Sequence, residues 1–182
     1  DYVQRKGAQD DVKNWAVGQA VAVVSQLEVL LDAKRGRDGV FPELTLFDCH
    51  ACHHPMSDAR WQPKSAFGNH LAPGLVRLND ANILMLYQIL RHTSPTAAVG
   101  FKTAVSKLNL SLVGQGDMQI AASELSEEAR RSASELSAKG VRGDLLWRMA
   151  LSLVDDGLDG TYKDYAGAEQ ATMAIGSVVN AL

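Results

Sequence analysis

The sequence predicts an all-α protein, a helical bundle of about five or six helices with one long loop after the first helix. Three observations predict this fold. Apolar residues recur near the 3.6-residue period of a helix in several segments, each ended by a capping or breaking residue. No segment combines alternating apolar positions with β-branched residues over more than a few positions. The 182 residues, 46% of them hydrophobic, suffice for a single domain over residues 1–182.

The first predicted helix covers residues 9–34. Its apolar positions follow the helical period, and the breaker Gly36 ends it. A bilayer span needs roughly 20 predominantly apolar residues in succession. Polar side chains interrupt residues 15–31 at Gln19, Ser25, Gln26 and Glu28. We therefore expect a core helix and no membrane span.

A long loop follows between Gly36 and Gly74. It holds four of the five prolines, which disfavour regular structure. It also holds both cysteines, four of the five histidines and the aromatic residues Phe41, Phe47, Trp61 and Phe67. Long loops inside compact domains are usually functional or disordered. We expect this one to be ordered by wrapping a large apolar cofactor.

The remaining chain is predicted to be helical. The expected helices cover residues 75–91, 95–112, 117–138, 143–156 and 162–181. Ser94 and Pro95 suit the N-cap and first position of the second of these, and Gly140 ends the third. Gly157 and Gly160 separate the last two helices. Residues 123–137, rich in Ser, Glu and Ala, predict an exposed helix face.

Composition excludes several classes of function. The net charge of -3 leaves no basic face for nucleic acid. A phosphate-binding glycine loop, a nucleophile elbow and a pair of catalytic carboxylates are all missing from the sequence, so we do not expect an enzyme. The first six residues lack the apolar centre of a signal peptide.

The most specific feature is the pentapeptide Cys49-His50-Ala51-Cys52-His53. Covalent haem attachment needs two thiols for the two vinyl groups and an imidazole directly after them for the iron. Cys49 and Cys52 meet the first requirement and His53 meets the second. A redox dithiol would sit in a βαβ context, and a zinc site would draw on a second ligand pair, which the sequence lacks. The motif thus predicts haem c, with His53 as the proximal ligand of the iron, and a zinc site or a redox dithiol are the alternatives.

The second axial ligand is less tightly specified. His70 is the first choice, because the 17 residues after His53 span up to roughly 55 Å when extended, enough to round a porphyrin. A solvated loop histidine is the alternative interpretation of His70. His92, at a helix end, is the second choice. Methionine is a common core filler, so ligation is less expected than burial for Met56, Met85, Met118, Met149 and Met173.

Three tryptophans could line the haem pocket or fill the core. Trp61 is nearest the attachment motif and is a candidate for cofactor contact. Burial is the expectation for Trp61, and equally for Trp15 and Trp147, because large aromatic side chains contribute strongly to cores.

Two segments carry a resemblance to multihaem c-type cytochromes: Phe47-Asp48-Cys49-His50-Ala51-Cys52-His53-His54 with Ala59-Arg60-Trp61 behind it, and the closing Ala168-Glu169-Gln170-Ala171-Thr172-Met173-Ala174. The resemblance implies export before haem attachment, a periplasmic or extracytoplasmic location, and electron transfer with redox partner proteins. This chain has one attachment motif only, so it is either monohaem or one part of a protein with neighbouring haem domains. In the second case His54 becomes a candidate ligand of a neighbouring haem. A gas-binding or sensing module with an open distal site is the alternative function.

Overall fold

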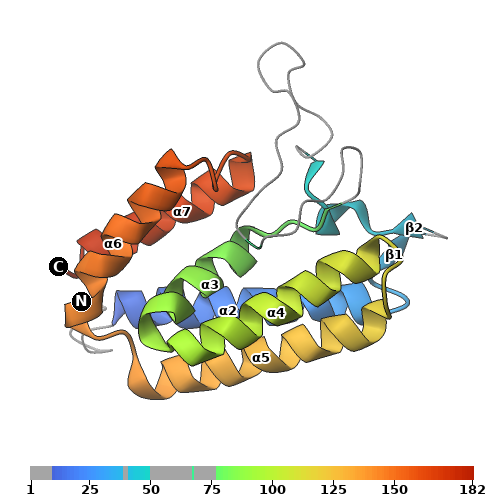
Figure 1. The fold of residues 1–182 in the computed structure, drawn as a ribbon, viewed down its shortest axis with the longest axis horizontal. Helices are drawn as coiled ribbons and strands as arrows, with labels where there is room; N and C mark the ends of the chain where they lie inside the picture. Colours follow the sequence, from blue (N-terminus) through green and yellow to red (C-terminus); the bar gives the residue numbers. More distant parts are fainter. Residues whose placement is uncertain (1–9, 39–40, 50–66, 68–76) are drawn as a thin grey trace, which may run out of the picture.

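A computed structural model describes residues 10–38, 41–49, 67 and 77–182 of the chain. Within these ranges six helices form the body of the protein, which confirms the all-α prediction (Figure 1). The only strands described are β1 (Arg37–Asp38) and β2 (Phe41–Pro42), a two-residue antiparallel ladder followed by the short 3-10 helix Leu44–Leu46. The helix bounds are Asp11–Leu31 for α2, Ala81–Thr93 for α3, Pro95–Leu112 for α4, Met118–Lys139 for α5, Gly143–Leu158 for α6 and Tyr165–Val179 for α7.

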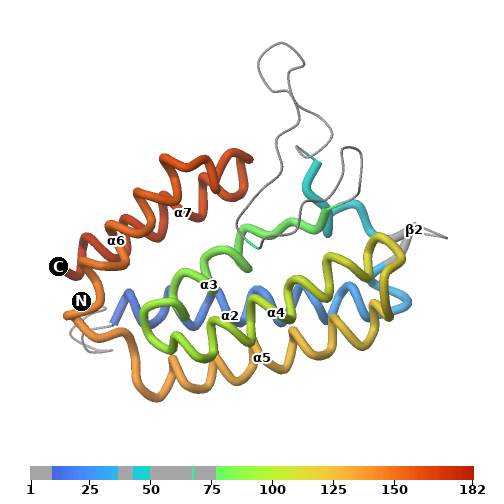
Figure 2. The backbone as a smooth tube through the Cα atoms, viewed as in Figure 1, coloured from blue at the N-terminus to red at the C-terminus, as the bar shows by residue number. Residues whose placement is uncertain are grey.

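The helices are arranged as a bundle with a helical hairpin on one side. Helix α2 packs along α5 and also contacts α3, while α4 packs between α3 and α5. Helices α6 and α7 pair with each other, and both contact α3 (Figure 2). Helix α3 therefore joins the bundle to the α6–α7 hairpin.

The close packing of α2 against α5 depends on small side chains. The face of α5 that is buried carries Ala121, Ala122, Ser126, Ala129 and Ser132. Small residues allow two helix backbones to approach closely, and the buried Ser132 hydroxyl donates to the Glu128 carbonyl at 2.8 Å. Residues 123–137 do present an exposed face as predicted, but the other face of the same turns is buried against α2 and α4.

Several helix ends lie where the capping residues predicted them. Ser94 is the N-cap of α4, and Pro95 is its first residue. Asp117 caps α5 by accepting a hydrogen bond from the Ile120 N–H at 3.0 Å. Gly140 ends α5 with a φ of +65°, a conformation that glycine adopts without strain.

Other helix ends differ from the prediction for identifiable reasons. Of the expected helix 75–91, residues 75 and 76 lie outside the described residues, and α3 begins only at Ala81 because Leu78 pairs with Phe47 in a β-bridge. Helix α6 continues through Gly157 to Leu158, since one glycine costs a helix only about 1 kcal/mol. Helix α7 begins at Tyr165 because Asp164 caps it.

Helix α2 contributes to the core along its whole length. Eight of its residues are buried, among them Ala16, Ala20, Val23 and Leu27, which agrees with the expected core helix. By length and composition alone, α2 is the one described helix that could cross a membrane, a criterion that core helices and signal sequences also meet. The absence of a membrane span stays a prediction.

Candidate functional site

Of the predicted site residues, the structure describes Cys49. Cys52, His53, Trp61 and His70 lie outside the described residues, as do His50, His54 and Met56. What the structure does show is how the chain is held immediately before, within and after the segment that carries the motif. These attachment points show which helices of the protein the segment is fixed to.

The two ends of the motif segment are hydrogen bonded to each other. The Asp48 N–H donates to the Arg77 carbonyl at 2.9 Å, and the Asn79 N–H donates to the Leu46 carbonyl at 2.9 Å. Phe47 and Leu78 form the antiparallel bridge between these two bonds. We call residues 46–48 and 77–79 the loop junction. The two chain segments that flank residues 50–76 therefore meet at one place, directly before α3.

Core packing and side-chain bonds fix the loop junction in place. Leu46 and Leu78 are 5% and 4% exposed, so each strand of the bridge buries one leucine. The Asn79 carbonyl accepts a hydrogen bond from the Gln26 Nε2 of α2 at 2.7 Å, and its side-chain Oδ1 accepts from the Ala81 N–H of α3 at 3.2 Å. The junction is thus tied to two helices. Cys49 follows it at once, as an exposed, free thiol.

Phe67 is a third attachment point, in the middle of the segment. It is 6% exposed, and its ring meets the Tyr87 ring edge-on at a centroid distance of 5.4 Å. The Ser106 hydroxyl of α4 donates to the Phe67 carbonyl at 3.3 Å. Phe67 was expected among aromatic residues around a cofactor, and in the structure it packs on α3 and α4.

A cleft continues from Phe67 along the groove between α3 and α4. Its volume is about 500 Å³, and its walls include Tyr87 and Ser106, the residues that hold Phe67. Two cationic side chains, Arg91 and Lys102, also line it, and the Arg91 guanidinium lies 5.8 Å from the centre of the Tyr87 ring. The walls are mostly apolar, and the Arg91 guanidinium is also paired with Asp156.

His92, the second choice for the distal ligand, lies in the last turn of α3. Burial lowers the pKa of its imidazole, and the nearby Arg91 and Arg148 lower this pKa further. Its buried Nε2 atom has no hydrogen-bond partner within the described part of the chain. From Ala81 to His92 the helix rises roughly 16 Å, which places His92 at the end of α3 remote from the loop junction.

The methionines and tryptophans divide between core and surface. Met85 and Met149 are fully buried, which confirms their core role, whereas Met173 is 54% exposed. Trp15 is buried as expected. The expected burial of Trp147 is wrong, because 60% of this residue is exposed on α6. Met118 is half-buried at the start of α5.

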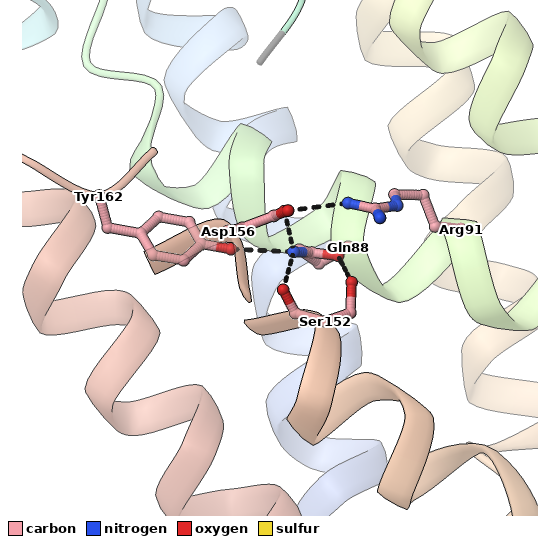
Figure 3. Close-up of polar contacts among 5 residues, drawn as sticks. All are labelled: Gln88, Arg91, Ser152, Asp156 and Tyr162. Atoms are coloured by element: carbon pink, nitrogen blue, oxygen red, sulfur yellow. Dashed lines mark hydrogen bonds and ion pairs between the residues drawn. The ribbon is translucent and has the colours of Figure 1, made fainter. Parts of the chain in front are cut away.

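A buried polar cluster joins α3 to the α6–α7 hairpin, and the sequence analysis did not predict it. Gln88, only 1% exposed, donates from Nε2 to the Asp156 carboxylate and to the Tyr162 hydroxyl oxygen, the latter at 3.0 Å (Figure 3). The Ser152 hydroxyl donates to the Gln88 Oε1 at 3.1 Å, and the Arg91 Nη1 lies 2.9 Å from Asp156 Oδ2. Only the buried position of Gln88 on an otherwise apolar helix face could have pointed to it.

The pKa shifts of the groups in this cluster indicate a structural role. Burial raises the pKa of Asp156, an effect that the nearby Arg91 opposes. Burial also raises the pKa of Tyr162 to about 12, so the phenol stays protonated at neutral pH. The neutral Gln88 amide between these two groups holds the hairpin on α3 and supplies no nucleophile or base.

In the part of the chain that the structure describes, no group of three or more His, Cys, Asp or Glu side chains could hold a metal ion. No family model, curated protein or solved structure matches this chain. The likeness to c-type cytochromes thus rests on the motif with its flanking residues and on residues 168–174 of the sequence.

Proposed function

We propose that this protein is a c-type cytochrome module that carries one haem and transfers electrons. Cys49 and Cys52 would hold the haem by thioether bonds, and His53 would be the proximal ligand of the iron. The observation that carries the proposal is the Cys49-His50-Ala51-Cys52-His53 pentapeptide, whose two thiols and following imidazole meet the requirements of haem attachment. The exposed, free Cys49 agrees with this role, since a buried thiol would be inaccessible to a large cofactor.

Each thioether forms by addition of a cysteine S–H across a vinyl double bond. The sulfur bonds to one vinyl carbon and the proton goes to the other, so no oxidant or reductant is consumed. The loop junction supports this arrangement, because hydrogen bonds at Asp48 and Asn79 fix the backbone directly before the first thiol. The attached group would then be tethered to the protein body at α3.

His70 is proposed as the distal ligand, and Phe67 supports this assignment. Three peptide units separate the two residues, so the Cα of His70 lies within roughly 11 Å of the Cα of Phe67. Because Phe67 is docked on α3 and α4, the His70 Cα can reach fewer positions than the Cα of a histidine on a freely solvated loop. Trp61 is proposed to contact the cofactor.

The bound haem iron would supply one-electron exchange, with a potential set by its axial ligands and burial. The chain's own residues would hold the cofactor, supply both axial ligands and limit access of water. We propose redox proteins as partners, including neighbouring haem domains, and a periplasmic or extracytoplasmic location, since haem attachment to such motifs implies export.

The experiment is production of the protein in a host that attaches haem c, followed by a denaturing gel stained for haem peroxidase activity. The wild-type band should stain, because thioether bonds survive denaturation. A Cys49→Ala, Cys52→Ala double variant should not stain, although it should still fold into helices by circular dichroism. An unstained wild-type band from a host that loads a control cytochrome would refute the proposal.

A further inference from the structure

Helix α6 carries a continuous apolar stripe on its exposed side. Trp147, Leu151, Val154 and Leu158 are 60%, 48%, 47% and 83% exposed. Their spacing of four, three and four residues places them on one face of the helix and is the spacing of a coiled-coil seam. The other side of α6 packs into the core through Leu146, Met149, Ala150 and Leu153. Helix α6 is therefore apolar on two faces, of which its own chain covers one.

The stripe is large for a surface feature of a small protein. Its exposed fractions add up to between two and three whole side chains, or roughly 400 Å² of mostly apolar surface, given that a large aromatic side chain buries about 150–250 Å² and an aliphatic one less. Patches of about 300–600 Å² are the largest on typical monomers and often mark interaction sites. Single exposed apolar residues elsewhere, such as Val99 on α4 and Ile120 on α5, form no such row.

Charge on one flank of the stripe indicates which partner fits. Arg148 and Asp155 are both exposed, and they lie seven residues apart, so they occupy the same side of the helix. If a second α6 packs antiparallel on the first, Leu151 meets Val154 of the second copy. Arg148 of each copy then lies beside Asp155 of the other, which gives two equivalent ion pairs. The stripe is complementary to itself under a two-fold axis.

A parallel arrangement lacks this complementarity. In a parallel pair of helices the charged flank of one copy faces the opposite flank of the other. On that opposite flank α6 carries Ala150 and Gly157, which offer no charge to Arg148 or Asp155. The antiparallel arrangement is therefore favoured.

We propose that α6 is a homodimer interface, in which the stripe of Trp147, Leu151, Val154 and Leu158 packs antiparallel against the same stripe of a second copy of this chain. The buried surface of roughly 400 Å² per copy is about half of what a stable complex needs, so the dimer is weak, with a dissociation constant in the micromolar-to-millimolar range. The proposal does not depend on haem binding.

The first test is sedimentation velocity of the full chain from about 5 to 500 µM, since mass action shifts a weak dimer over such a range. The wild-type sedimentation coefficient should rise with concentration towards that of a dimer. Leu151→Glu should sediment as a monomer throughout, because dimerisation would bury two carboxylates. Ile120→Glu, an equally drastic change at an exposed residue of α5, should behave like wild type. A wild type that stays monomeric to the highest concentration overturns the proposal.

The second test exchanges the flanking charges. Arg148→Glu and Asp155→Arg should each weaken the dimer several-fold, because each places like charges beside one another. An equimolar mixture of the two single variants should associate as wild type does, since opposite charges meet again in the mixed dimer. Failure of the mixture to recover, with both variants folded, would overturn the antiparallel arrangement.

Discussion

Phe67 offers the sharpest perturbation of the segment that carries the proposed site. The change Phe67→Ala removes a ring that is 6% exposed and that packs edge-on against Tyr87. Truncation of a buried phenylalanine costs about 3–5 kcal/mol, to which the lost aromatic pair contributes about 0.5–1.5 kcal/mol. We take the lower end, about 3 kcal/mol, because Phe67 lies on a loop and its surroundings can close over the gap.

The assay is urea unfolding followed by helical circular dichroism. With a slope near 2 kcal/mol per M, a loss of about 3 kcal/mol lowers the midpoint by about 1.5 M. Release of Phe67 should also free His70, so that part of the haem becomes high-spin while its covalent attachment remains. The Phe67→Leu variant keeps most of the buried apolar area, and a loss of only about 1 kcal/mol is expected.

The loss should also exceed that of Ser106→Ala, which removes one hydrogen bond to the Phe67 carbonyl and should cost about 1 kcal/mol. A Phe67→Ala protein that unfolds within 0.5 M of the wild-type midpoint, with an unchanged spectrum, would refute the argument that Phe67 anchors the segment; here about 0.5 M is the shift that a loss of 1 kcal/mol produces.

Three further changes have expected outcomes. Gly36→Ala should cost about 2 kcal/mol or more in urea unfolding, because a Cβ there lies 2.1 Å from the Val29 carbonyl oxygen, whereas Gly18→Ala, with open space around it, should stabilise by about 0.5–1 kcal/mol. Gln88→Leu should cost about 1–3 kcal/mol, because it removes the amide that donates to both Asp156 and Tyr162. Arg91 still pairs with Asp156 in this variant, and unchanged stability would contradict the expectation. The pKa of Tyr162 rises from about 10 to about 12 on folding. The stability that the protonated phenol contributes to the fold is therefore fully present below pH 10 and is lost as the pH rises towards 12. In Tyr162→Phe the drop in the free energy of unfolding between pH 10 and pH 12 should be smaller by about 1 kcal/mol, a value reduced to allow for solvent screening.

Local sequence rules predicted the fold where they act alone. Ser94, Pro95, Asp117 and Gly140 lie at helix ends as expected, because capping depends on residues close together in the chain. The local rules failed where contacts between residues far apart in the chain determine the structure. Leu78 fits the helical period, yet its bridge to Phe47, thirty-one positions earlier, keeps α3 from starting before Ala81.

The candidate site likewise has one feature that local sequence predicts and others that it does not. The attachment motif is recognisable because the chemistry needs its residues at fixed local spacing. The docking of Phe67 on Tyr87 and the cluster around Gln88 both join residues far apart in sequence, and no local pattern encodes them. Trp147 was expected to be buried on hydrophobicity alone, but its exposure follows from which face of α6 meets the core.

The most direct test of the proposed haem site is a pair of visible spectra, oxidised and reduced, of the purified protein. We predict covalently bound haem that is six-coordinate and low-spin in both states, and that becomes high-spin in His70→Ala. A low-spin spectrum unaffected by His70→Ala would refute His70 as the distal ligand. A high-spin wild type that binds carbon monoxide rapidly when reduced would favour the open distal site instead. A protein without covalent haem would contradict the central claim.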